Sequence, residues 1–304
     1  MKRNKSKMNV TEAIPAKSKK RHSILAVILI ALFLMFGGSF FGGLLMILLQ
    51  VIFSNQSSDV QFVISTYFLF IGIDIFVLAY CALCEKDILK SMCSAKKGGL
   101  SGNTGNMFLG GLILGFVSNG FCVLVAWINK DLTFDYNVFS PVYFLFALTN
   151  VLIQAGAEEL LSRGYMQGAL MERYSFKTAV IVNGLFFGLM HLPNDGVTVL
   201  SIVNTTIYGI VMSMITYYFH SLWFSIAHHT AWNFTQNFIF GLPNSGLAAE
   251  KAIFKLTGSR HSIIYNSKFG VEGGIVIFIL GLISIIAILI WSKKNTNACQ
   301  ENNT

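Results

Sequence analysis

The segment Ala157-Glu158-Glu159-Leu160-Leu161-Ser162-Arg163 places two adjacent carboxylates and one guanidinium inside an apolar run that begins near Pro141. Ionisable side chains are costly in a membrane-spanning helix, so they usually face a protein interior or a water-filled cavity and carry function. On a helix, Glu159 and Arg163 are four residues apart and share a face, whereas Glu158 is turned about 100° away. We therefore predict that Glu159 and Arg163 neutralise each other and that Glu158 stays free for chemistry.

The composition of the chain is that of a membrane protein. Of its 304 residues, 54% are hydrophobic and 12% are charged, and the mean hydropathy is +0.63. A soluble domain is about 25% charged, so this chain has too few charges to cover a surface that faces water. The net charge of +8 lies in the N-terminal tail and the short loops. It therefore indicates membrane topology and contact with lipid headgroups, and we expect no nucleic-acid partner.

Apolar runs of about 20 residues recur along the chain, which predicts an all-α, polytopic integral membrane protein. Residues 1–22 form a basic tail, residues 23–292 the transmembrane helical domain, and residues 293–304 a polar tail. Within the domain we expect about eight helices, and the glycines at 37, 38, 42 and 43 predict close helix contact or a kink in the first. The expected spans lie near residues 23–53, 61–83, 105–128, 141–173, 177–193, 197–219, 221–241 and 271–292.

The distribution of Lys and Arg favours an orientation with both termini in the cytoplasm. These residues gather in the two tails, in the loop 84–104 and in the turn 173–177, which all fall on one side. The loops 54–60 and 194–196, on the other side, have none. Low cysteine use and Lys/Asn-rich tails further suggest a bacterial plasma membrane.

One loop conflicts with this orientation. Residues 242–270 belong to the second side, yet they contain Lys251, Lys255, Arg260 and Lys268. An amphipathic helix that lies in the membrane interface near Ala248–Leu256 would account for these cations.

Three apolar segments carry polar side chains in a pattern that suits amide hydrolysis: Glu158-Glu159-x3-Arg163, Phe187-x3-His191 and His229-x3-Asn233. Hydrolysis needs a water, a base that activates it, and donors for the developing oxyanion. A carboxylate, two imidazoles and a carboxamide can fill these roles. Counting from the turn near residues 174–176 places Glu158 and His191 at one depth, about 22 Å along neighbouring helices. We expect a polar cavity between the fourth, fifth and seventh helices, and His229 reaches it only if the seventh helix begins deeper or tilts.

In this order and on separate spans, the motifs resemble those of the CPBP family of intramembrane proteases. This family takes in the type II CAAX prenyl endopeptidases and the bacteriocin-processing and bacteriocin-immunity proteins. The context Leu222-Trp223-x2-Ile226-x2-His229-x3-Asn233 is similar to the last motif of the family, and it selects His229 over its neighbour His228. The resemblance covers roughly residues 140–240.

The resemblance implies a glutamate-dependent intramembrane endopeptidase of the CAAX type. Glu158 would activate water and His191 would help hold it, while His229 and Asn233 would stabilise the oxyanion. Supporting roles would fall to Glu159, Arg163 and Phe187. We expect no required cofactor. If zinc is bound instead, Glu158, His191 and His229 would be its ligands, although the helical His-Glu-x-x-His signature is absent.

Three functional classes stay open at this stage. The first is a peptidase that cleaves a membrane-associated or lipid-modified peptide or protein. The second is a non-catalytic protein of the same fold, acting in bacteriocin self-immunity or on a membrane partner such as a sensor kinase or peptide exporter. The third is a transporter with a proton relay through Glu158 and Asp74, which the lack of an internal repeat disfavours. A purely structural ion cluster is the alternative for Glu158, Glu159 and Arg163, but two acids with one base leave a costly net charge.

Overall fold

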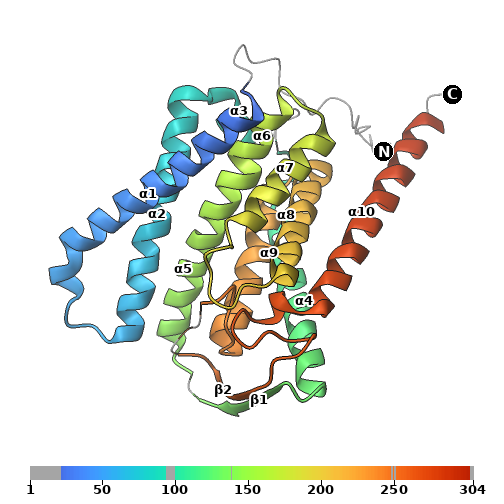
Figure 1. Ribbon diagram of the computed structural model, residues 1–304. Helices are drawn as coiled ribbons and strands as arrows, with labels where there is room; N and C mark the ends of the chain where they lie inside the picture. The colour runs from blue at the N-terminus through green and yellow to red at the C-terminus, as the bar shows by residue number, and fades with distance from the viewer. Residues whose placement is uncertain (1–21, 94–99, 138, 248, 250, 302–304) are drawn as a thin grey trace, which may run out of the picture.

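The computed structural model describes residues 22–93, 100–137, 139–247, 249 and 251–301 (Figure 1), so the predicted basic tail lies outside the described residues except for His22. The all-α, polytopic fold is confirmed, because every expected span is helical. The helices are α1 (Ile24–Phe53), α2 (Ser58–Cys84), α4 (Gly105–Ile128), α5 (Pro141–Glu159), α7 (Phe176–Leu189), α8 (Val199–Phe219), α9 (Leu222–Phe234) and α10 (Ile275–Glu301), with a short α3 (Lys86–Cys93) between the second and third spans.

Six of the helical segments in the described part of the chain are long and apolar enough to cross a membrane, fewer than the eight expected. The helix α7 has only 14 residues, because the turn containing Pro193 follows it and proline cannot continue a helix. The helix α9 ends at Phe234 and continues as a π-helical turn, η2 (Thr235–Ile239). In contrast, α10 runs through most of the polar tail predicted at residues 293–304.

The two ends of the helical bundle differ in structure. Figure 1 shows α3, the start of α1, the start of α7 and the end of α10 at one end of the bundle, here called the α3 end. The loops after α1, α4, α7 and α9 lie at the opposite end, together with the two strands β1 (Leu132–Tyr136) and β2 (Phe254–Ser259). We call this second end the sheet end.

The helix predicted near Ala248–Leu256 is wrong, because residues 254–256 lie in β2. This strand pairs in antiparallel register with β1, more than a hundred residues earlier in the chain. Alternating side chains such as Phe254-Lys255-Leu256 suit a strand once a partner is present, but the partner is too distant in sequence for local analysis to find.

Three of the four cations of the loop 242–270 lie beside or opposite carboxylates at the same end of the bundle, and Lys251 lies over the Tyr143 ring. Arg260 pairs with Asp131 at 2.9 Å, Lys268 Nζ lies 4.0 Å from Asp195 Oδ1, and Lys255 stands opposite Asp135 in the sheet. Burial alone would raise the pKa of the Asp131 carboxyl, but hydrogen bonds from Ser262, Asn129 and Arg260 hold it below its usual value. The loop is therefore folded against neighbouring segments that supply carboxylates to three of its cations.

The glycines of the first span make the close helix contact that the sequence predicts. A Cβ atom on Gly42 would lie 2.0 Å from the Phe68 carbonyl oxygen of α2, and one on Gly72 would lie 2.1 Å from the Gly38 carbonyl oxygen. The glycines of the fourth and fifth spans contact other helices rather than each other. Gly164 faces Met92 of α3, whereas Gly184 faces Ile210 and Thr206 of α8.

Gly42→Ala is expected to push α1 away from α2, because the new methyl group would overlap the backbone at Phe68. Such overpacking costs roughly 1–3 kcal/mol. Gly43→Ala is the matched control, since a Cβ atom there meets nothing within 4 Å. Thermal unfolding in one detergent should show a lower Tm for Gly42→Ala alone, and equal Tm values for both variants would contradict the close contact.

Candidate active site

The two glutamates end α5, and the chain continues as a π-helical segment, η1 (Leu160–Met166), before α6 (Gln167–Met171). π-Helical turns inside α-helices are rare and often occur at functional sites. Buried carboxamides stabilise this turn from outside, because Asn183 Nδ2 donates to the Ser162 carbonyl at 2.6 Å and Gln167 Nε2 donates to the Ser213 carbonyl at 3.0 Å. Sequence analysis treated residues 141–173 as one regular helix and missed the turn.

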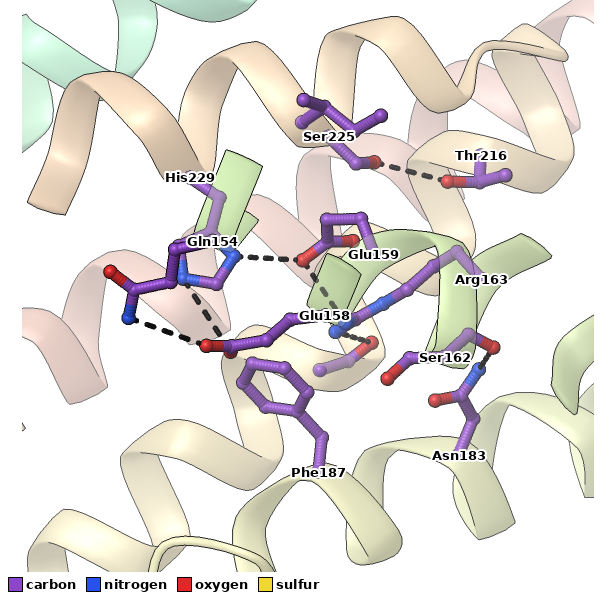
Figure 2. Close-up of polar contacts among 12 residues, drawn as sticks. Gln154, Glu158, Glu159, Ser162, Arg163, Asn183, Phe187, Thr216, Ser225 and His229 are labelled. Carbon is purple, nitrogen blue, oxygen red and sulfur yellow. Dashed lines mark hydrogen bonds and ion pairs between the residues drawn. The ribbon is translucent and has the colours of Figure 1, made fainter. Parts of the chain in front are cut away.

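The predicted pairing of Glu159 with Arg163 is confirmed (Figure 2). Both side chains are fully buried, with 0% of each exposed, and Arg163 Nη1 lies 3.1 Å from Glu159 Oε1. Arg163 Nη2 also donates to the Gly209 carbonyl of α8 at 3.3 Å. The guanidinium carbon lies 4.4 Å from the ring centre of Phe187, so this ring serves as an aromatic support for the cation.

His229 connects the two carboxylates. Its Nδ1 lies 3.1 Å from Glu159 Oε1, and its Nε2 lies 3.9 Å from Glu158 Oε2. Glu158 keeps 24% of its side chain exposed and accepts a hydrogen bond from Gln154 Nε2 at 3.4 Å. Figure 2 shows the two glutamates on opposite sides of the His229 ring. The adjacent acids are thus separated in role, since one is buried and paired while the other faces open space.

That open space is a cavity of about 280 Å³, and all four residues predicted as catalytic line it: Glu158, His191, His229 and Asn233. His191 lies in the turn after α7, where its Nδ1 is 2.8 Å from the Phe187 carbonyl oxygen. A carbonyl only accepts, so Nδ1 carries the proton and Nε2 is free to accept a hydrogen bond. His228 does not line the cavity and stacks near Trp232.

The cavity has a mainly apolar and a mainly polar wall. The mainly apolar wall comes from α1, α2, α5, η1 and the end of α7, and it also carries Thr66, Asn150 and Gln154. Its apolar members are Met35, Phe62, Phe70, Ile73, Val151, Leu161, Phe186 and Met190. The polar wall comes from α8, α9 and the loops at the sheet end, and it includes Asn194, Asn204, Asn233, Asn237, Asn244, Ser245 and Glu272. Carboxamides donate and accept hydrogen bonds, as a peptide backbone does.

Sequence analysis missed Tyr208 of α8. This residue lines the cavity, and its ring centre lies 5.5 Å from that of His229 and 5.7 Å from that of Phe187. Its hydroxyl and Glu159 Oε2 are both buried and have no hydrogen-bond partner among the described residues. The spacing of Asn204 and Tyr208, four residues apart in an apolar helix, is the signal that would have pointed to this wall.

Glu272, in the turn η3 (Val271–Gly273), anchors a cap over the polar wall. Trp232 Nε1 donates to its Oε1 at 2.8 Å, and the backbone N–H of Ser245 donates to its Oε2 at 2.7 Å. These bonds join α9, η3 and residues 242–247, which we call the cap loop. Gln236 Nε2 holds the same loop through the Pro243 carbonyl at 2.6 Å.

Stability is expected to fall as pH rises from about 4.5 to about 7. Burial raises the pKa of the Glu272 carboxyl from 4.5 to about 7, although hydrogen bonds from Trp232 and Ser245 oppose the shift. The folded protein then keeps a proton that the unfolded chain releases, so this contribution is complete below pH 4.5 and is lost on passing pH 7. It amounts to at most roughly 3 kcal/mol. Tm measured at pH 5 and pH 8 should differ in the wild type by more than in Glu272→Gln, and an identical difference would contradict the assignment.

The arrangement does not fit a metal ion. Among the residues that the structure describes, no three His, Cys, Asp or Glu side chains come together as a group that could hold one. This finding includes Glu158, His191 and His229, the set that the zinc alternative requires.

Comparison with known proteins gives the family of this region. Residues 140–235 match the family described as type II CAAX prenyl endopeptidase Rce1-like. The predicted family resemblance is confirmed. The Rce1-like region covers 96 of the 304 residues and contains Glu158, His191, His229 and Asn233, whereas Glu272, the cap loop and β2 lie outside it. No curated protein and no solved structure matches the chain.

Proposed function

We propose that this multi-pass membrane protein is an intramembrane endopeptidase in which Glu158 activates the water that cleaves a peptide bond. The observation that supports this most is the division between the two adjacent carboxylates. Glu159 is buried and paired with Arg163 and His229, whereas Glu158 faces the cavity that His191 and Asn233 also line. A general base needs this access to water, whereas a carboxylate in a purely structural ion cluster does not.

In the proposed reaction, Glu158 and His191 Nε2 hold the water between them. Glu158 takes a proton from the water as its oxygen attacks the substrate carbonyl carbon, and the carbonyl oxygen becomes an oxyanion. The Asn233 amide donates to this oxyanion, and so does Nε2 of His229 in its doubly protonated form, since Nδ1 faces the Glu159 carboxylate. Glu158 then passes its proton to the amide nitrogen. The oxyanion re-forms the carbonyl as the C–N bond breaks, and a carboxylic acid and an amine are released. Every step uses side chains of this chain alone, and no cofactor is required.

The two walls of the cavity suit a membrane-associated or lipid-modified peptide. The carboxamides of the polar wall would pair with the peptide backbone, while an apolar side chain or lipid group would lie against α1 and α2. The other partners that we expect are the membrane lipids.

We further propose that the protein lies in a bacterial plasma membrane with both termini in the cytoplasm. The Lys and Arg residues at the α3 end support this orientation. The cations of the loop 242–270, which first seemed to oppose it, each lie in a cap where three of them face a carboxylate.

The function is tested by incubating the purified protein in nanodiscs with a panel of prenylated peptides and leader peptides, with and without a chelator. We expect mass spectrometry to find cleavage of at least one peptide, at the same rate with and without chelator. Loss of cleavage with chelator would contradict the metal-free mechanism. No cleavage of any peptide by the wild type would favour the non-catalytic immunity or regulatory protein.

A further inference from the structure

The cavity extends from the sheet end to the middle of the bundle. At the sheet end it is lined by the first halves of α2 and α8, the start of α10 and the last turns of α7 and α9. At mid-depth it is lined by residues between 150 and 162 of α5 and η1 and by Met35 of α1. Toward the α3 end, the buried ion pair of Glu159 with Arg163 and the buried segment η1 close the space. The loop residues that line the cavity, Asn194, Asn244, Ser245 and Leu247, belong to the sheet end.

Side chains at the sheet end form the rim of the cavity. Phe62, at the start of α2, is 36% exposed, and Leu247, in the cap loop, is 55% exposed. Deeper lining residues such as Ala157, Ser162 and Asn204 are buried. The mouth therefore lies between the start of α2 and the cap loop.

The charges at the two ends of the bundle are distributed unequally. By sequence, sixteen Lys and Arg residues belong to the N-terminal tail, the 84–104 segment, the 173–177 turn and the last part of α10, which adjoin the α3 end. The sheet-end loops carry five: Lys130, Lys251, Lys255, Arg260 and Lys268. An excess of Lys and Arg in short loops marks the cytoplasmic side of a membrane protein, and by this criterion the α3 end is cytoplasmic.

We infer that the cavity opens on the non-cytoplasmic side of the membrane and that its substrate is a peptide segment presented at that outer face. Such a segment belongs to an exported peptide or to a membrane-anchored protein, so export precedes cleavage. The nature of the substrate rests on the proposed peptidase function. The side of the membrane on which the cavity opens rests only on the charge distribution and the position of the cavity.

The recognised segment is extended and uncharged. The polar wall offers mainly carboxamide groups, which pair with the N–H and C=O groups of an extended backbone. Glu272, the carboxylate of that wall, is already occupied by Trp232 and Ser245. A chain that leaves the outer leaflet can enter past Phe62 with its apolar side toward α2.

Cysteine labelling tests on which side of the membrane the cavity opens. In a variant whose five native cysteines are replaced, Lys268→Cys reports on the sheet end and Lys90→Cys reports on the α3 end, since both side chains are exposed. We expect a membrane-impermeant maleimide to label Lys268→Cys in intact spheroplasts, and to label Lys90→Cys only after permeabilisation. The opposite pattern would overturn the inference, whatever the activity of the protein.

The substrate is tested in the same spheroplasts. A peptide that the purified protein cleaves is added outside with a charged, impermeant tag, and its products should appear outside in the wild type and be absent in Glu158→Gln. Cleavage by the purified protein, but only after permeabilisation in spheroplasts, would overturn the outer-face inference and leave the peptidase function standing. No cleavage even by the purified wild type would remove the function and the substrate inference together.

Discussion

Arg163→Met is expected to destabilise the folded protein by roughly 3–5 kcal/mol, the cost of leaving a buried charge without its partner. Glu159 and Arg163 are both inaccessible to solvent and lie 3.1 Å apart. Without the guanidinium, the Glu159 carboxylate would keep only the His229 ring as a cationic or donating neighbour, and the Gly209 carbonyl would lose its donor. We expect a marked fall in Tm and in the yield of monodisperse protein.

A double variant distinguishes two causes of the lost stability: a buried charge without its partner, and the loss of side-chain packing. In Glu159→Gln combined with Arg163→Met, no unpaired charge stays buried, so most of the lost stability should return. Arg173→Met is the surface control, since Arg173 is exposed and lies over the Tyr174 ring. Equal stability of Arg163→Met and the wild type would contradict the buried ion pair, and a double variant as unstable as Arg163→Met would attribute the effect to packing.

His229→Phe is expected to lower the cleavage rate by about 10²–10³-fold, the usual effect of removing a donor to an oxyanion. The His229 ring lies between the two carboxylates, with Nδ1 at 3.1 Å from Glu159 and Nε2 at 3.9 Å from Glu158. It also lines the cavity beside Asn233. Phenylalanine keeps the ring volume among Phe187 and Tyr208, so the loss should fall mainly on kcat.

His228→Phe is the matched control for this prediction. His228 is the neighbouring residue on the same helix and equally buried, but it stacks near Phe224 and Trp232 and does not line the cavity. We expect nearly wild-type cleavage from this variant. The two variants are compared by steady-state kinetics on one peptide. An equal fall in kcat in both would contradict a catalytic role for His229.

Much of the bundle could be predicted because membrane helices carry a strong local signal. Each apolar run near 20 residues long proved helical, and the i, i+4 spacing was enough to predict the pairing of Glu159 with Arg163. The three motifs also sufficed to place Glu158, His191, His229 and Asn233 around one cavity. His229 does reach the cavity, on a helix that packs closely on the glycines of α4, where a Cβ atom on Gly115 would lie 2.4 Å from the His228 carbonyl oxygen.

The features that escaped prediction depend on contacts between distant segments. The π-helical turn at Leu160–Met166 is held by Asn183 of α7, and Gln167, which follows the turn, bonds to α8. The strand β2 needs a partner from before α5. Glu272 reads as an ordinary loop residue until Trp232 and Ser245 are brought to it. Tyr208 is marked in the sequence only by its i, i+4 spacing from Asn204 in an apolar helix. Each of these residues acquires its role only in the assembled bundle.

The measurement that tests the central claim most directly compares the wild type with Glu158→Gln, purified and reconstituted side by side, on one cleavable peptide. Glutamine keeps the size of the side chain and can still bond to Gln154, but it cannot accept a proton from water. The account predicts that both proteins have the same Tm and that cleavage falls by at least about 10³-fold in the variant. A variant that cleaves the peptide at the wild-type rate would contradict it.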